Sequence, residues 1–211
     1  GATFPVLLEA ARAEDPGRGV GNLYAANLFG ACAGVLGSAY LLVAFLGLAG
    51  THWLAVAINA ATGLAALSLG GASVAAPPAP KKGPLARTAL AAVFASGICG
   101  MALEVVWTRI LVPSFNNSVY GFASVLFVFL LGLGLGSRLG ALLPHSGRPA
   151  FLGTLQLAAG VLAFAGFAGF EVTQLLQMRF ADMTASGVLP ILFAPLLEAL
   201  VLLLPVAVAQ G

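Results

Sequence analysis

The chain has 211 residues, of which 60% are hydrophobic and 8% are charged, and its mean hydropathy is +1.04. Soluble domains are usually about 25% charged, so this chain lacks the polar residues that would cover a water-facing surface. A lipid bilayer is the solvent that fits it. The formal net charge is only +2, and no basic patch carries interleaved aromatic residues, so we expect no binding of nucleic acid.

Six stretches are long and apolar enough for transmembrane helices, each of which needs about 20 residues. The first is longer than one crossing requires, so we expect it to tilt or break, and a turn is predicted near Gly50. The sequence therefore predicts an all-α fold, a polytopic transmembrane helical bundle of about six helices. The six stretches cover approximately 20–48, 51–70, 88–112, 118–142, 150–171 and 187–209.

Basic residues recur on every second connection between these stretches. By the positive-inside rule those connections face the cytoplasm, so both ends of the segment are predicted on the cytoplasmic side of the inner membrane. The other connections, near Gly50, near Asn116 and in a predicted loop at 172–186, then face the opposite side. The basic connections carry Arg12 and Arg18, then Lys81 and Lys82, then Arg138, His145 and Arg148.

One Pro-rich polar linker, 71–86, divides the chain and predicts two helical units. Residues 1–70 are interpreted as the end of a first unit with two transmembrane helices, and 87–211 as a second unit with four. Residues 2–12 resemble the tail of an earlier helix, and the chain stops inside an apolar stretch. We therefore expect a piece of a longer protein.

Ionisable residues inside apolar stretches are the first candidates for function, because a charge at the helix centre costs about 2.5–3.5 kcal/mol on insertion scales. Glu198 lies near the middle of 187–209. It is expected either to bind a proton or cation, or to be a protonated, hydrogen-bonded packing residue.

A second acidic residue, Glu104, lies five positions before Arg109. This spacing separates the two by about 140° around a helix, so we expect each to pair with another helix or to reach the interface. Trp107 between them fits an interfacial anchor.

Polar and small residues complete the list of candidates. Asn27 and Gln156 are predicted to bond across helices, which gives a candidate intramembrane polar site of Glu198, Glu104, Asn27, Gln156 and Arg109. Small residues at four-residue spacing predict close helix packing at Gly30 and Gly34, and at Gly132, Gly136 and Gly140. No HExxH, CxxC or GxSxG motif occurs, so we expect no catalytic residue, metal site or cofactor.

Two sequence blocks carry a family resemblance. ALEVVWTRIL, followed after seven residues by VYGFASVLFVFLLGLGLGS (102–137), resembles the membrane region of bacterial spermidine synthase-like proteins, the fused major-facilitator/spermidine synthases. GATFPVLLEA and GRGVGNLYAANLFGACAGVLGS (17–38) are similar to another block of that family. The resemblance implies a major-facilitator-like membrane domain joined to a cytosolic aminopropyltransferase-like domain, which this chain does not contain.

A third segment, GALLPHSGRP (140–149), resembles the major-facilitator loop between the second and third helices of a repeat. Pro144 stands where that loop has an acidic residue. The matching positions are Gly140, Leu142, Gly147 and Arg148.

Three functions remain open at this point. The chain is expected to be a membrane domain that anchors or serves a cytosolic partner domain, one half of a transporter for a small solute such as a polyamine, or a non-catalytic subunit of a larger membrane complex. Its partners are then the lipid bilayer and further membrane subunits or a cytosolic domain. A polyamine site would need at least two convergent carboxylates.

Overall fold

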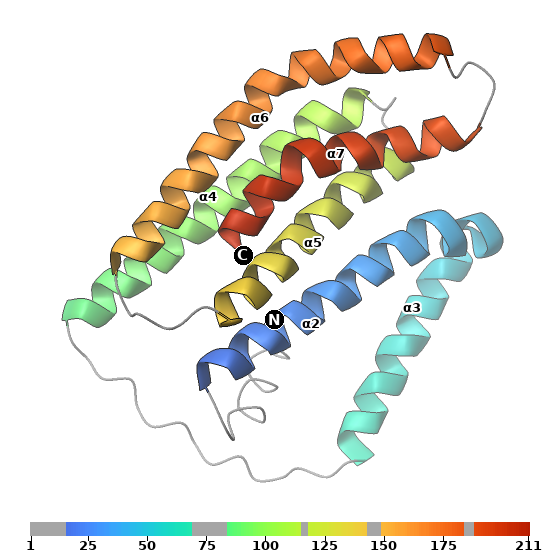
Figure 1. Ribbon diagram of the computed structural model, residues 1–211. Helices are drawn as coiled ribbons and strands as arrows, with labels where there is room; N and C mark the ends of the chain where they lie inside the picture. Colours follow the sequence, from blue (N-terminus) through green and yellow to red (C-terminus); the bar gives the residue numbers. More distant parts are fainter. Residues whose placement is uncertain (1–15, 69–83, 115–117, 143–148, 184–187) are drawn as a thin grey trace.

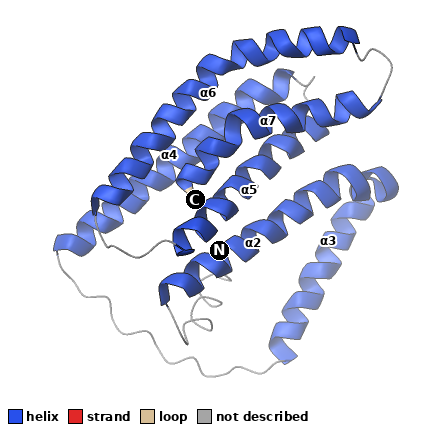
Figure 2. Ribbon diagram, in the orientation of Figure 1, coloured by secondary structure: helices blue, strands red, loops and turns tan. Residues whose placement is uncertain are grey.

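The computed structural model describes residues 16–68, 84–114, 118–142, 149–183 and 188–211, and the structural statements below concern these residues. They are almost entirely helical and form no strand (Figure 2), so the all-α prediction is confirmed for this part of the chain. The elements are α2 (Pro16–Leu36), the short π-helix η1 (Gly37–Leu42), α3 (Val43–Ser68), α4 (Pro84–Ser114), α5 (Val119–Leu142), α6 (Pro149–Met183) and α7 (Val188–Gln210).

Four helical segments of the described chain are long and apolar enough to cross a membrane. Leu196–Gln210 adds a shorter apolar segment in α7. These lengths and compositions are those of a multi-pass membrane protein. The four long segments are Gly21–Ser68, Leu90–Pro113, Val119–Leu142 and Gly153–Leu175.

Helix α5 occupies the centre of the bundle, with α2 packed on one side and α7 on the other (Figure 1). Helix α7 also contacts α6 and α4. Apolar side chains from α4, α5 and α7 fill the space where these helices meet and form one buried core. Its members are Trp107, Leu111, Val125, Val128, Phe129, Ala199, Leu202, Leu203 and Ala207.

Glycines on two faces of α5 let its neighbours approach closely. A Cβ at Gly132 would meet the backbone carbonyl carbon of Ala207 at 3.1 Å, and one at Gly136 would meet the Cα of Gly211 at 2.8 Å. A Cβ at Gly134 would face α2 instead, 3.2 Å from the Phe29 ring. Small residues allow such contacts because they bring two backbones together.

The other glycines of the predicted stripes have no such neighbour. A Cβ at Gly30, Gly34 or Gly140 would meet nothing within 4 Å in the described structure, so the packing prediction fails for these three inside this part of the chain. The reason on α5 is geometric. A four-residue step advances about 40° around a helix, so Gly140 has rotated about 80° away from the face that Gly132 turns towards α7.

The chain reverses direction near the start of α3. The backbone of Gly47 has φ 66° and ψ 178°, a combination open almost only to glycine. The turn predicted near Gly50 therefore lies at Gly47, with Thr51 Oγ1 donating to the Gly47 carbonyl at 2.8 Å. Beyond it, α3 extends away from α2 (Figure 1) and has no buried residue.

Helix α6 is longer than predicted. The stretch 172–186 is predicted as a loop, but α6 continues to Met183, and 184–187 lie outside the described residues. Hydropathy marks the apolar part of a helix rather than its end. Residues 172–183 contain no glycine or proline, so nothing in that stretch ends the helix. Other predicted features at 2–12, Lys81, Lys82, Asn116 and His145 also lie outside the described residues.

Candidate functional site

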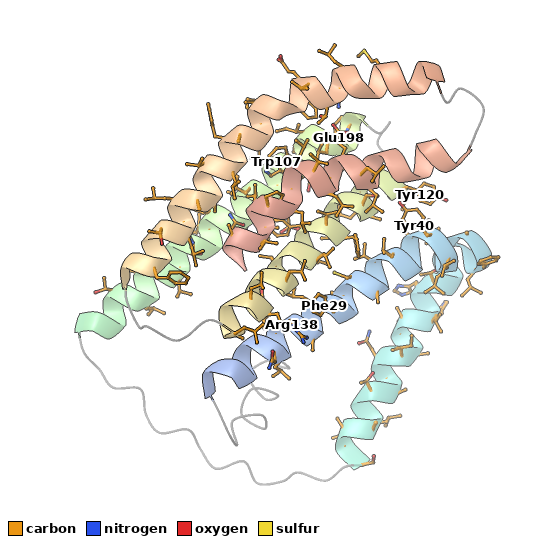
Figure 3. All side chains as sticks on the ribbon, viewed as in Figure 1. Phe29, Tyr40, Trp107, Tyr120, Arg138 and Glu198 are labelled. Atoms are coloured by element: carbon orange, nitrogen blue, oxygen red, sulfur yellow. The ribbon has the colours of Figure 1, made fainter. Side chains whose placement is uncertain are left out.

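The candidate site centres on Glu198, in the middle of α7 (Figure 3). Its side chain is 5% exposed, although a carboxyl group is rarely buried without partners. Thr173 Oγ1 lies 2.8 Å from Glu198 Oε1, and Gln174 Nε2 donates to the same oxygen at 3.2 Å. The structure therefore places the carboxyl group inside a polar contact between α6 and α7.

Both of these partners come from the part of α6 that the sequence predicts as a loop. Because α6 stays helical to Met183, Thr173 and Gln174 are neighbours on its surface and reach the same oxygen of Glu198. Thr173 Oγ1 also lies 2.7 Å from the carbonyl oxygen of Phe170, three residues earlier. The signal that could have identified the pair is the Thr-Gln step at the end of an otherwise apolar stretch.

Helix α4 brings Trp107 to the same region (Figure 3). Trp107 is 2% exposed, and a Cβ at Gly166 of α6 would lie 3.1 Å from its six-membered ring and 3.2 Å from the Leu202 carbonyl oxygen. The interface-anchor prediction for Trp107 is therefore wrong. The indole fills the space between α4, α6 and α7, and the absence of a side chain at Gly166 makes room for it.

The charged residues beside Trp107 take different positions. Glu104 is half-buried and Arg109 is exposed. Thr108 Oγ1 donates to the backbone carbonyl of Glu104 at 2.8 Å, so that hydroxyl is satisfied within α4. The hydrogen bonds described for Glu198 come from α6, and α4 supplies none of them.

Asn27 and Gln156 do not join the site. Asn27 is exposed on α2, and α2 packs against α5. Gln156 is exposed on α6, where its amide donates to Ser96 Oγ of α4. Because Gln156 lies seventeen residues before Thr173 in the same helix, the two are about 25 Å apart along its axis. The predicted set of five residues is therefore dispersed, although the Gln156 contact does link two helices.

A second polar contact, absent from the sequence prediction, joins η1 to α5. The Tyr40 hydroxyl and Ser124 Oγ are 3.1 Å apart, and the rings of Tyr40 and Tyr120 lie 5.1 Å apart at 49° (Figure 3). Ser124 is fully buried. This contact satisfies a buried hydroxyl and secures the turn after α2 against the start of α5.

Among the described residues, no group of three His, Cys, Asp or Glu side chains could hold a metal ion. No protein-family model matches the chain, and no curated protein or solved structure gives a significant match. The site therefore rests on its own geometry, a buried carboxyl group held between two helices by a hydroxyl and an amide.

Proposed function

We propose that this chain is the integral membrane domain of a spermidine synthase-like protein, and that it anchors or serves a cytosolic partner domain. One observation supports this most strongly, the distribution of polar and apolar side chains. Phe45, Phe94 and Phe164 are 70–82% exposed on α3, α4 and α6, whereas the carboxyl group of Glu198 is buried. Lipid suits such a surface, and polar groups inside it must find partners within the protein.

The family part of the proposal rests on the blocks 17–38 and 102–137. Both blocks contribute to the core of the structure. Leu28 and Cys32 of the first are buried, as are Trp107 and Val128 of the second. In this proposal any aminopropyltransferase-like activity belongs to the cytosolic partner domain, and the helices described here have no catalytic role.

The proposed arrangement has six crossings in a major-facilitator-like bundle of the bacterial inner membrane. The break at Gly47 divides the long segment Gly21–Ser68 into two, and α7 is 23 residues long, which suffices for one crossing. With the basic connections inside, residues 81–82 face the cytoplasm and 116–117 face the opposite side.

Accessibility of single cysteines tests this topology in the full chain. Cys32 and Cys99 are first replaced by alanine, and then Lys82→Cys or Asn117→Cys is introduced. A membrane-impermeant thiol reagent should label Asn117→Cys in intact cells, and Lys82→Cys only in inverted vesicles. The reverse pattern, or release of the chain from membranes without detergent, would overturn the proposed membrane arrangement.

The anchoring role has a separate test in the reading frame around this segment. A downstream domain with a methyltransferase-like fold supports the membrane domain of a spermidine synthase-like protein. A stop codon directly after the segment contradicts that proposal, and would favour a non-catalytic subunit of a larger membrane complex.

Transport of a small solute such as a polyamine is a second candidate, favoured by the position of Glu198 in the middle of a membrane-length helix. Glu104 is the second carboxylate that the sequence predicts for such a site, and its helix α4 contacts α7. Uptake into proteoliposomes by the parent chain and by the Glu198→Gln variant distinguishes the two functions. Uptake that depends on Glu198 supports transport, and equal uptake by both proteins removes Glu198 from any such mechanism.

A further inference from the structure

Asn27 is a polar side chain of α2 without a hydrogen-bond partner in the described part of the chain. It is exposed within the membrane-length segment Gly21–Ser68, about 9 Å along the helix axis from Gly21. Its carboxamide makes no hydrogen bond to another described residue, whereas the amide of Asn59 in the same segment donates to the Ala55 carbonyl. An amide that faces hydrocarbon without a partner is costly. Asn27 therefore needs a hydrogen-bonding partner beyond the described helices.

Asn27 lies on the side of α2 that points away from α5. Helix α2 packs on α5 through buried side chains, and each residue advances about 100° around a helix. The residues that share the side of Asn27 are then centred about 160° from the buried ones. This set is called the Asn27 face, and its members are Asn27, Gly30 and Gly34. The buried residues on the opposite side are Ala25, Leu28 and Cys32.

The Asn27 face is open and carries no large side chain. A Cβ at Gly30 or Gly34 would meet nothing within 4 Å in the described structure, and α3 extends away from α2 (Figure 1). Among the described side chains of α2, Tyr24 is the only large hydrophobic one that is exposed, whereas α4 exposes Phe94 and other large apolar residues. Glycines four residues apart in an apolar membrane helix are typical of a face on which a second helix packs closely.

The chemistry of Asn27 fits a second copy of the same chain. Copies inserted in one orientation can be related by a two-fold axis along the membrane normal, which brings identical residues together at the same depth. A carboxamide both donates and accepts hydrogen bonds, so two Asn27 side chains can bond to each other reciprocally. Two carboxylates or two ammonium groups would instead repel. A single asparagine in the seam between two helices also fixes their register.

We propose that the Asn27 face is a self-association surface, on which α2 of a second copy packs in parallel and the two Asn27 carboxamides hydrogen-bond to each other. Gly30 and Gly34 let the two backbones approach. This inference rests on the membrane location proposed above and adds to the anchoring role. A pair of membrane domains would hold two cytosolic partner domains side by side.

Energy transfer between donor-labelled and acceptor-labelled copies of the full chain in lipid vesicles measures this association. We expect transfer above the level of random encounters, and it should fall as lipid dilutes the protein. Asn27→Leu should weaken the association about tenfold, the order expected for a hydrogen bond between membrane helices, and Asn27→Gln should keep most of it. Gly30→Leu should weaken it by separating the backbones. The matched control Asn59→Leu should associate like the parent, since Asn59 bonds within its own helix.

Disulfide formation between copies identifies what covers the face. Cys32 and Cys99 are first replaced by alanine in the full chain. Ala31→Cys, one turn after Asn27, should then form a dimer on oxidation in the membrane. Ala61→Cys, exposed on α3, is the matched control and should form far less.

Three results would overturn the self-association surface. The first is a chain that stays in the membrane and shows no transfer above random encounters. The second is association as strong as the parent's in both Asn27→Leu and Gly30→Leu. The third is a dimer that forms more readily with Ala61→Cys than with Ala31→Cys, which would place the contact on α3. Release of the chain without detergent would instead contradict the membrane arrangement itself, so the two failures are distinguishable.

Discussion

Helices α3 and α7 are both strongly apolar, yet they occupy opposite kinds of environment. Five residues of the second half of α7 are almost completely buried, namely Ala199, Leu202, Leu203, Val206 and Ala207. Helix α3 has no buried residue, and among the described elements its main contact is with η1, which directly precedes it. Hydropathy alone therefore does not decide which helix enters the core.

Close backbone approach distinguishes the two helices. In a bilayer, lipid is as apolar as a leucine side chain, so helices associate through van der Waals packing and hydrogen bonds. Helix α7 has both, against the glycines of α5 and through Glu198 to α6. The polar side chains of α3 bond instead to their own helix, as Asn59 Nδ2 does to the Ala55 carbonyl at 3.0 Å. Helix α3 can therefore face lipid with these polar groups satisfied.

The two tryptophans of the chain provide the largest expected contrast between these regions. Trp107 is 2% exposed in the core and Trp53 is 69% exposed on α3. Trp107→Ala should lower the free energy of unfolding in detergent by about 3–5 kcal/mol, the usual loss for a buried aromatic side chain. Trp53→Ala should change it by less than about 0.5 kcal/mol.

Fluorescence provides an independent check of this contrast. Trp107→Phe leaves Trp53 as the single fluorophore, and Trp53→Phe leaves Trp107. Brominated lipid should quench Trp53 strongly and Trp107 weakly. Equal quenching of the two would mean that α3 is covered by protein, and the contrast between the regions would disappear.

Glycine-to-alanine changes at two positions of α5 should have opposite effects on the free energy of unfolding. At Gly132 the new methyl group would contact Ala207 of α7, and we expect a loss of about 1–3 kcal/mol from overpacking. At Gly140 it would meet nothing within 4 Å of the described structure, so the better helix propensity of alanine should add about 0.5–1 kcal/mol. Denaturant titration of both variants in the same micelles measures the difference. A similar effect at both positions would contradict the close α5–α7 contact.

The reversal at Gly47 can be tested in the same way. A residue with a Cβ is strained at φ 66° and ψ 178°. Gly47→Ala should therefore lower the free energy of unfolding by about 1–3 kcal/mol or change the direction of α3 relative to α2. Gly63→Ala is the matched control, because Gly63 lies inside α3 with nothing within 4 Å and should gain stability. Spin labels on α2 and α3 would report any change in direction as a new distance. Identical stability and distances in both variants would rule out this conformation of Gly47.

Much of the fold could be predicted from the sequence, because long apolar stretches in a chain with 8% charged residues have few alternatives to membrane helices. The starts of α4, α5 and α6 are close to the predicted ones. Hydropathy did not predict the end of α6, since Gln174, Gln177 and Arg179 continue the helix without being apolar enough to mark a membrane segment.

Of the residues in the candidate site, the sequence predicted only Glu198. Glu198 stands out because a carboxyl group in a leucine-rich stretch is unusual. Its partner Thr173 was not predicted, because the Thr-Gln pair marks a polar point on α6 but the direction of that face depends on tertiary packing. Trp107 was misassigned for the same reason, since an aromatic residue beside charges has the same sequence pattern at an interface and in a core. Gly166, which makes room for the indole, lies 59 residues away.

The smallest expected effect concerns η1, which connects α2 to α3 just before the reversal at Gly47. Tyr40→Phe removes the hydroxyl that lies 3.1 Å from Ser124 Oγ and keeps the ring against Tyr120. A net cost of about 0.5–1.5 kcal/mol is expected for one hydrogen bond. Because each single variant also changes other contacts, the informative quantity is the coupling in a double-mutant cycle with Ser124→Ala. A coupling energy near zero would show that the tyrosine hydroxyl does not hold η1 to α5, leaving ring packing as the contact that secures the turn.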